Sequence, residues 1–273
     1  AVRSRVFGDI GAEVIKIESA AYPDGLRQKR ENQAIGDSFA RAHRNHLGFG
    51  LDLRSAEGAG VFAQLVATAD ALFANFKPGT LPALGFDEGR LRDINPALVV
   101  AESSAYGDEG PWSTRMGYGP LVRAATGVTS LWTSDQPNPG ARHPFYDATT
   151  VFPDHVVGRI TAIGALAGLI RRKRSGVGAR IHVSQAEAGI NQLDTRFVMF
   201  AAEADGHAAE VRHDDTVHMV LPCTGDDEWC VVSTSSEDAD LAAWAVEHTP
   251  AQVAERMQAV GVAAGPMNRP DDV

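Results

Sequence analysis

Short apolar segments alternate with helical patterns over the first two-thirds of the chain, and this alternation restricts the fold more than any other feature. The segments expected to form strands are Val14–Glu18, Gly48–Leu53, Ala71–Ala74, Leu98–Ser103 and Arg180–Ser184. Helical patterns lie between them at Ser55–Thr68, Leu81–Leu84, Phe86–Asp93 and His155–Arg174. Strands that alternate with helices form parallel sheets, because the crossover helices cover both faces. The sequence therefore predicts an α/β fold with a doubly wound, mostly parallel sheet.

The pattern changes after about Leu193, where a smaller α/β unit is expected to follow. Two strands of a hairpin and then two helices are expected at Val217–Val220, Trp229–Ser233, Ala239–His248 and Pro250–Gly261. The final segment, GPMNRPDDV, is expected to add neither a helix nor a strand. We therefore assign a large domain to residues 1–205 and a small domain to residues 206–273.

Charge and composition exclude several classes of protein. The net charge of −10 over 273 residues argues against general nucleic-acid binding, which requires a basic surface. No apolar run reaches the roughly 18 residues of a membrane-spanning helix. Cys223 and Cys230 have neither a zinc nor a redox spacing, so we expect reduced thiols, no metal and a cytoplasmic protein. The segment GAEVIKIE ends in an acidic residue, as dinucleotide-binding strands do, but no GxGxxG motif precedes it.

Two loops that follow expected strands carry residues suited to ligand binding. In NFKPGTLPALGF, Lys77 stands beside a short helix that Thr80 can cap, and a lysine beside free helix N–H groups binds anions. The alternative is an ordinary strand-to-helix loop. The glycine-rich loop ESSAYGDEGPW follows the next strand. Because ligands of open α/β sheets bind at the carboxyl ends of the strands, both loops lie where a ligand is expected.

Asp154 stands immediately before a long apolar run that ends in basic residues and Gly176. A carboxylate at this place can cap the helix by accepting hydrogen bonds from the free N–H groups of its first turn. The residues alone favour this cap, and a chemical role is the alternative. Small residues recur on one face of the helix, where they allow another backbone or a ligand to approach closely: Gly158, Thr161, Ala165 and Gly168.

Seven segments, taken in order, resemble the family III CoA-transferases, relatives of the formyl-CoA and carnitine CoA-transferases. They are GDIGAEVIKIE, YPDGLR, FGLDLRSAEG, NFKPGTLPALGF, INPALVVAESSAYGDEGPW, RRKRSGVGARIHVSQAEA and GDDEWCVV. The resemblance implies an enzyme that moves CoA from an acyl-CoA thioester to a carboxylic acid. It also implies an interlocked homodimer. Family members are longer, so we expect segments to be absent at the start, near Ser235–Asp240 and at the end.

The resemblance also implies the site residues. The family's nucleophile is an aspartate followed by glycines at the fourth and tenth positions, which here are Asp154, Gly158 and Gly164. This carboxylate forms a mixed anhydride with the acyl group and then a thioester with CoA. The residues that the resemblance assigns to CoA binding are Arg27, Asn75, Phe76, Lys77, Pro78, Gly79, Tyr106 and Tyr118. Arg27 and Lys77 would bind phosphates, and Phe76 would pack on the adenine. Where the family has a basic residue before the LDLR segment, this chain has Asn45-His46-Leu47.

Two alternatives to CoA transfer remain. The α-methylacyl-CoA racemases share the fold and use a His-Asp pair, but Tyr118 stands at the histidine position in MGYGPLVRAATG. A tyrosine, with a pKa near 10, is a poor base at neutral pH. The other alternative is a half of a fused protein that binds CoA without turnover, against which the aspartate at 154 argues.

Overall fold

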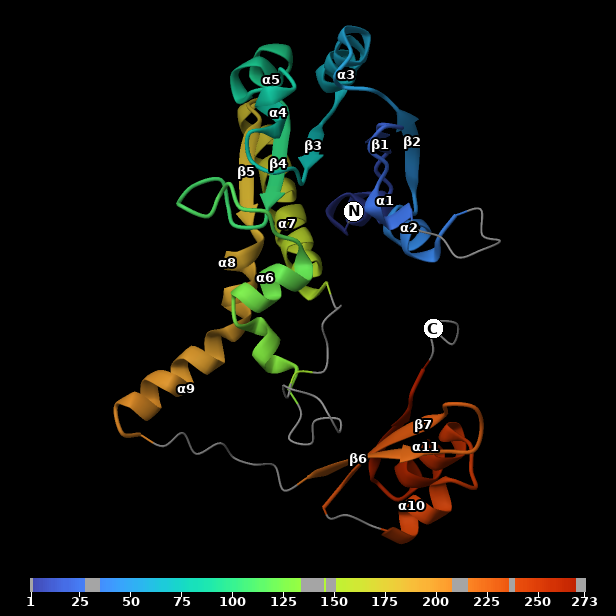
Figure 1. Ribbon diagram of the computed structural model, residues 1–273. Helices are drawn as coiled ribbons and strands as arrows, with labels where there is room; N and C mark the ends of the chain where they lie inside the picture. Colours follow the sequence, from blue (N-terminus) through green and yellow to red (C-terminus); the bar gives the residue numbers. More distant parts are fainter. Residues whose placement is uncertain are drawn as a thin grey trace. The chain divides into compact units, whose positions relative to one another are not determined.

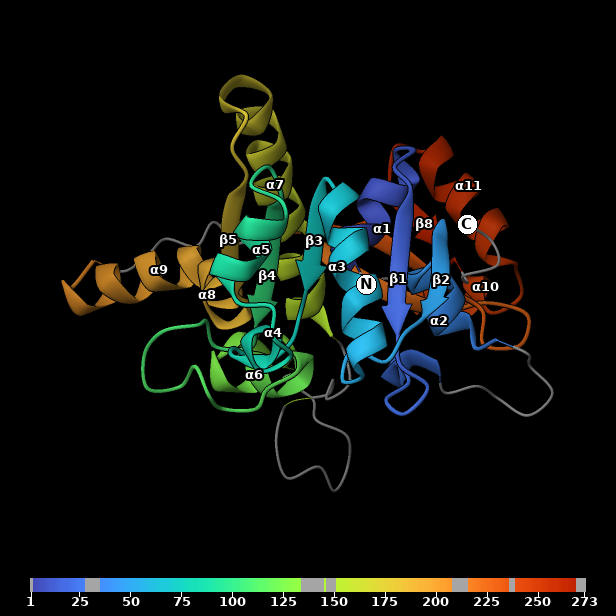
Figure 2. The same cartoon turned by 90° about the horizontal axis from the view of Figure 1, so that it is seen from above.

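The computed structural model describes residues 2–27, 35–133, 145, 151–207, 216–235 and 239–268. The chain forms two compact units, Ala1–Ala201 and Ala202–Val273. The ribbon is shown in Figure 1, and from above in Figure 2. The segment expected to be absent near Ser235–Asp240 coincides with residues 236–238, which lie outside the described residues.

The first unit contains two parallel sheets. β1 (Val14–Glu18) pairs with β2 (His46–Gly50), and β3 (Ala71–Ala74), β4 (Val99–Ser104) and β5 (Ala179–Ser184) form the other sheet in that order. The predicted parallel pairing is thus confirmed. The second strand was expected at Gly48–Leu53, but it begins and ends earlier. The reason is a turn, in which the Asp52 carboxylate accepts from the Arg54 amide and leads into Ser55, the N-cap of α3 (Ala56–Thr68).

Helices cover both faces of the three-stranded sheet. On one face, Val99 and Ala101 of β4 pack with Ala162 and Ala165 of α7 (Phe152–Ser175) and with Phe7 of α1 (Val2–Asp9). On the other face, Leu98 and Val100 pack with buried residues of α3 and α5 (Glu88–Ile94). Figure 2 shows these two helices on the side of the sheet opposite α7. The remaining helices of this unit are α2 (Asp37–Ala42), α4 (Thr80–Ala83), α6 (Gly119–Ala125) and α8 (Gln185–Ile190), and α9 (Asp194–Ala204) crosses the boundary between the units.

Part of the small-residue face of α7, at Ala165 and Gly168, lies against the sheet, together with Gly164. A Cβ atom at Gly164 would lie 2.9 Å from Ile181 Cγ2, and one at Gly168 would lie 3.0 Å from Val99 Cγ1. Gly176, at φ 71°, ends the helix in the left-handed conformation and donates its N–H to Arg172 O. The absence of side chains at these glycines therefore sets how closely α7 approaches β4 and β5.

The second unit is a three-stranded antiparallel sheet with two helices. β6 (Val217–Pro222), β7 (Trp229–Thr234) and β8 (Ala263–Pro266) lie in that order, and α10 (Ala239–Ala245) and α11 (Pro250–Ala259) pack on the core around Cys230, Val232 and Val253. The expectation that GPMNRPDDV adds to no strand was wrong, since Gly265 and Pro266 belong to β8. Gly261, at φ 81°, turns the chain after α11 and brings this weakly strand-forming segment beside β7. Across the described ranges, no helix is both long and apolar enough to cross a membrane.

Candidate active site

Asp154 lies in the first turn of α7 but does not cap it. Val151 is the N-cap, and no side-chain cap bond is formed. The helix begins three residues earlier than predicted, because Pro153 fits the first turn, where no backbone N–H is needed. The cap interpretation of Asp154 was therefore wrong, and its carboxylate is available for other contacts.

The Asp154 carboxylate is half-buried, and its two oxygens differ. Oδ2 is buried and accepts no hydrogen bond from any residue that the structure describes. Burial raises the pKa of Asp154, and the hydrogen bond from Gln185 and the charge of His155 offset this only in part. Such a desolvated carboxylate holds its negative charge in an unfavourable environment, which makes it a stronger nucleophile than one in water.

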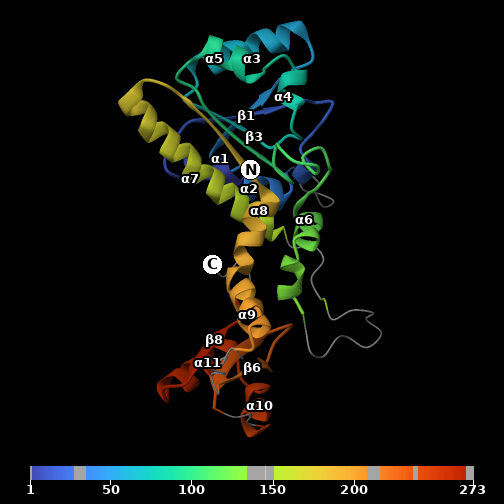
Figure 3. The ribbon, with the colours of Figure 1, turned by 90° about the vertical axis from the view of Figure 1, so that its left-hand side faces the viewer.

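Gly119, the first residue of α6, makes room for this buried oxygen. A Cβ atom at Gly119 would lie 2.1 Å from Asp154 Oδ2 and 3.0 Å from Val151 Cα. The first turns of α6, α7 and α8 therefore lie beside one another, as Figure 3 shows from the side.

Sequence reasoning missed Gly119 and Gln185. The sequence feature that could have identified Gln185 is its position directly after the expected strand Arg180–Ser184. A polar side chain that becomes buried there needs a hydrogen-bond partner. The signal for Gly119 was weaker. Only the position of α6 relative to Asp154 shows that this residue must lack a side chain.

Several predicted site residues lie at one edge of the three-stranded sheet. Because β3, β4 and β5 are parallel, the loops that follow them emerge together, as the arrowheads in Figure 1 show. The loop Asn75–Gly79 follows β3, Tyr106 follows β4, and Gln185 follows β5. The structure thus brings the candidate nucleophile to the edge at which open α/β sheets bind ligands.

The loop Asn75–Gly79 is open to solvent. Asn75, Phe76 and Lys77 are exposed, as a surface that binds a large ligand requires. Thr80 was expected to cap the following helix, but Gly79, at φ 85°, is the N-cap and Thr80 Oγ1 donates to Lys77 O over 2.7 Å. Gly79 takes the cap because only a glycine adopts this left-handed conformation without strain.

Tyr106 and Tyr118 lie close to each other through Gly117. A Cβ atom at Gly117 would lie 2.9 Å from Tyr106 Cε2, and Tyr118 is the extended N-cap residue that precedes Gly119. The Tyr106 ring also meets Trp112 edge-on, with ring centres 5.5 Å apart. Tyr118 therefore adjoins the glycine that lies against Asp154, and it is 59% exposed.

Polar side-chain contacts hold the loop that carries Tyr106 against β5. Asp108 accepts from Arg180 over 2.8 Å, and His182 Nδ1 lies 3.3 Å from the same carboxylate. His182 Nε2 is 2.9 Å from Ser104 Oγ, which donates to Gly107 O over 2.9 Å. The Ser104 hydroxyl carries one proton, which it can donate to only one of these two partners at a time.

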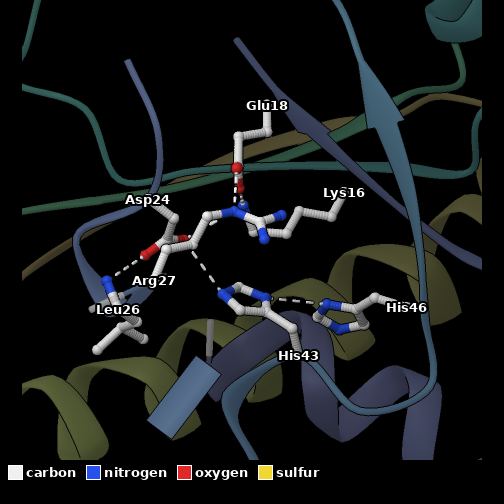
Figure 4. A network of polar contacts seen from close by, with 7 residues as sticks. All are labelled: Lys16, Glu18, Asp24, Leu26, Arg27, His43 and His46. Atoms are coloured by element: carbon white, nitrogen blue, oxygen red, sulfur yellow. Dashed lines mark hydrogen bonds and ion pairs between the residues drawn. The ribbon is translucent and has the colours of Figure 1, made fainter. Parts of the chain in front are cut away.

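Arg27 lies in a network of charged side chains that follows β1, shown in Figure 4. Its guanidinium pairs with Glu18 and stacks on the Phe39 ring, 3.9 Å from the ring centre. Lys16 also contacts Glu18 and lies 3.2 Å from Asp24. A phosphate that binds Arg27 must therefore compete with Glu18.

His43 completes this network as a neutral side chain. Its Nε2 lies 3.1 Å from Asp24 Oδ2, and its ring packs on Phe39. Burial, together with the nearby Lys16 ammonium, lowers the pKa of His43 to about 4. Over the described part of the chain, no group of three or more His, Cys, Asp or Glu side chains is placed to hold a metal ion.

The sequence matches known proteins over most of its length. The family model of CoA-transferase family III matches residues 2–239. A probable CoA-transferase of Mycobacterium tuberculosis is 56% identical over 99% of this chain and 38% of its own length. The beta subunit of a succinyl-CoA–L-malate CoA-transferase of Chloroflexus aurantiacus is 28% identical over 85% of this chain and 57% of its own. The chain therefore spans less than two thirds of these curated relatives.

A solved structure shares the fold. The crystal structure of a CaiB/BaiF family protein from Brucella suis superposes with a TM-score of 0.77 over 100% of this chain and 80% of that protein, at 23% identity. This similarity concerns the fold, whereas the family rests on the sequence matches. With the family model matched from residue 2 to residue 239, the chain belongs to CoA-transferase family III.

Proposed function

We propose that the protein transfers CoA from an acyl-CoA thioester to a carboxylic acid, with Asp154 as the nucleophile. The observation that carries this proposal is the buried Oδ2 of Asp154, which accepts no hydrogen bond from the described residues. Membership of the family and the names of its relatives support CoA transfer as the reaction class. A cytoplasmic location fits two cysteines that are both free and buried.

After each proposed step, the acyl group or the CoA is still held in a reactive bond, either an anhydride or a thioester. An oxygen of Asp154 attacks the thioester carbonyl, the C–S bond breaks, and CoA leaves as a thiolate from a mixed anhydride. The thiolate attacks Cγ of Asp154, which releases the first acid and leaves an aspartyl-CoA thioester. The acceptor carboxylate attacks Cγ of this thioester, which breaks the C–S bond and forms a second mixed anhydride. The released thiolate attacks the acyl carbon of the acceptor, which gives the new acyl-CoA and restores the Asp154 carboxylate. Because water would hydrolyse each intermediate, the burial of Asp154 serves the reaction directly.

The test of this reaction is a panel of donors and acceptors analysed by mass spectrometry. Succinyl-CoA and L-malate, named for the Chloroflexus relative, form the first pair to try. We expect a new thioester that contains the acceptor acid. Thioester hydrolysis alone would contradict the proposal. Deuterium exchange at the α-carbon of a 2-methylacyl-CoA in heavy water would instead indicate the racemase reaction, which the exposed Tyr118 does not favour.

The CoA-binding residues give a prediction about affinity. We propose that Lys77 and Arg27 bind the phosphates, with Asn75, Phe76, Pro78, Gly79, Tyr106 and Tyr118 along the remainder of the ligand. Lys77→Ala and Arg27→Ala should each weaken CoA binding by about 1–3 kcal/mol, the range for hydrogen bonds to charged groups. Arg27→Ala should have the smaller effect, since Arg27 must first leave Glu18. Calorimetry with CoA measures both.

A matched control removes one positive charge elsewhere. Arg92→Ala breaks only an exposed pair with Glu88 on α5 and should leave the affinity unchanged. Rising salt should weaken CoA binding to the unaltered protein more than to the Lys77 variant. Equal affinities for the unaltered protein and both site variants would place the phosphates elsewhere.

The oligomeric state gives a further prediction. We propose an interlocked homodimer, as the family resemblance implies. In support, α9 has no buried residue, and Phe197, Val198 and Phe200 on it are exposed, which is typical of a surface that another chain covers. Light scattering coupled to size exclusion at micromolar concentration should give twice the chain mass. A stable monomer would contradict this proposal without affecting the one for Asp154.

A further inference from the structure

Arg123 is a charged side chain in the core of the large unit. It lies in α6 and is only 1% exposed, which is rare for an arginine because burial removes water from its charge. Its guanidinium carbon lies 5.1 Å from the centre of the Trp132 ring, whose negative face attracts the cation. Arg123 therefore gives Trp132 a directional contact, which an apolar side chain of similar length would not provide.

Trp132 connects Arg123 to the helix that carries Asp154. Its ring meets that of Phe152 at 59°, with ring centres 5.5 Å apart, a usual geometry for an aromatic pair. Phe152 is the first residue of α7, and Asp154 lies two residues later in the same turn. The contacts from Arg123 through Trp132 to Phe152 thus end on the turn that holds the proposed nucleophile.

A second contact between α6 and this turn lies one helical turn from Arg123. Gly119 is four residues before Arg123, and residues so spaced share one face of a helix. A Cβ atom at Gly119 would lie 2.1 Å from Asp154 Oδ2, so this face is directed at the start of α7. Because the side chains of a helix lean towards its N-terminus, Arg123 extends back towards Gly119. The helix α6 therefore contacts the first turn of α7 directly at Gly119, and from Arg123 through Trp132.

Resting on the function proposed above, we propose that Arg123 is a positioning residue for Asp154 and acts through Trp132 and Phe152. The stack holds the start of α7 in one place, while Gly119 leaves only a small space for Oδ2. Asp154 must first attack the thioester carbonyl and later present its Cγ to the CoA thiolate. Both attacks require the reacting atoms to lie about 3–3.5 Å apart, so a small shift of this turn slows both.

The raised pKa of Asp154 argues against an electrostatic role for Arg123. A guanidinium that acted on the carboxylate by its charge would hold the pKa of Asp154 low. Burial instead raises this pKa. Arg123 therefore acts on the position of Asp154 and not on its charge.

The test measures turnover of succinyl-CoA and L-malate, or of the first active pair from the panel. Arg123→Met keeps the length of the side chain without the cation and should lower kcat by about 10- to 100-fold, up to the cost of a displacement of about 1 Å. The KM for the CoA ester should change by less than about threefold, since Arg123 acts on Asp154 and not on CoA. Arg123→Lys, which keeps the charge without the flat guanidinium, should recover part of the loss. Arg90→Met removes an exposed guanidinium 5.8 Å from the Phe86 ring on α5 and should keep normal turnover.

A double-mutant cycle tests whether the effect runs through the stack. Phe152→Leu removes the ring at the end of the stack and should lower kcat to a similar extent, again with little change in KM. The double variant should lose no more than about threefold beyond the worse single variant, because the second change affects contacts that are already broken. Losses that multiply would show independent effects and would overturn the proposal. If Arg123→Met does not fold, the cycle is made with Arg123→Lys.

Two further results would overturn the role of Arg123. One is a kcat for Arg123→Met within about threefold of normal, and the other is a loss only in proportion to the folded fraction. In either case the loss of transfer in Asp154→Asn would still support Asp154 as the nucleophile. If Asp154→Asn itself keeps normal transfer, the proposed function fails and the role of Arg123 fails with it.

Discussion

Replacement of Asp154 by alanine is expected to abolish CoA transfer, with a loss of at least about 10⁴-fold in turnover, as for the removal of other covalent nucleophiles. Without the carboxylate, neither the anhydride nor the aspartyl-CoA thioester can form. Asp154→Asn should fail as well, because a neutral amide has no anionic oxygen to attack the thioester. Both variants should retain CoA affinity by calorimetry, since the proposed phosphate contacts lie on other residues. Normal turnover by either variant would contradict the assignment.

A stability measurement provides the control for folding. Because burial raises the pKa of Asp154 above its ordinary value of 3.8, ionising this carboxylate in the folded state is unfavourable. The neutral Asp154→Asn variant should therefore be at least as stable as the unaltered protein at pH 7. This advantage should shrink as the pH falls through the folded-state pKa and vanish below 3.8, where the carboxyl is protonated in both states. Thermal unfolding at several pH values measures the difference.

Gly119→Ala is expected to have the next largest effect, a fall in kcat of about 100-fold or more. The new Cβ would lie 2.1 Å from Asp154 Oδ2 and 3.1 Å from Val151 Cβ, so the carboxylate or the start of α7 must move. A displacement of about 1 Å at a reacting group can cost about 100-fold in rate. The same overpacking should destabilise the protein by about 1–3 kcal/mol. Steady-state kinetics and thermal unfolding of the variant test both effects.

Gly60→Ala is the matched control for this substitution. Gly60 also lies within a helix, and nothing lies within 4 Å of the position of its Cβ. The change should keep full activity and stabilise the protein by about 0.5–1 kcal/mol, the usual gain of alanine over glycine inside a helix. A Gly119→Ala variant that behaves like Gly60→Ala would show that Oδ2 is not confined as described.

The large unit was predictable where local pattern and packing agree. β1 and β3 begin and end where the apolar runs predicted, and α3 and α5 follow the N-cap residues Ser55 and Asp87. Such strands and caps can be predicted because they depend on residues that are neighbours in the sequence. β8 was missed because its alanine, glycine and proline residues carry no strand signal, and only pairing with β7 makes it a strand.

The site was predictable only in part. Asp154 and the proposed CoA residues came from the order of motifs, whereas the contact of Asp154 with Gln185 and Gly119 joins three segments that are distant in sequence. The pairing of Arg27 with Glu18 was also not evident, although both flank the expected strand end, because an ion pair depends on rotamers and not on spacing. Long-range contacts of this kind require the fold.

Chemical capture of the intermediate tests the central claim most directly. The protein is mixed with succinyl-CoA, quenched with hydroxylamine, digested, and mapped by mass spectrometry. An anhydride or thioester at Asp154 would convert its side chain to a hydroxamate, so the account predicts this modification in the peptide that contains Asp154 and its absence in Asp154→Asn. Turnover with no adduct at Asp154, or with the adduct on another residue, would contradict the account.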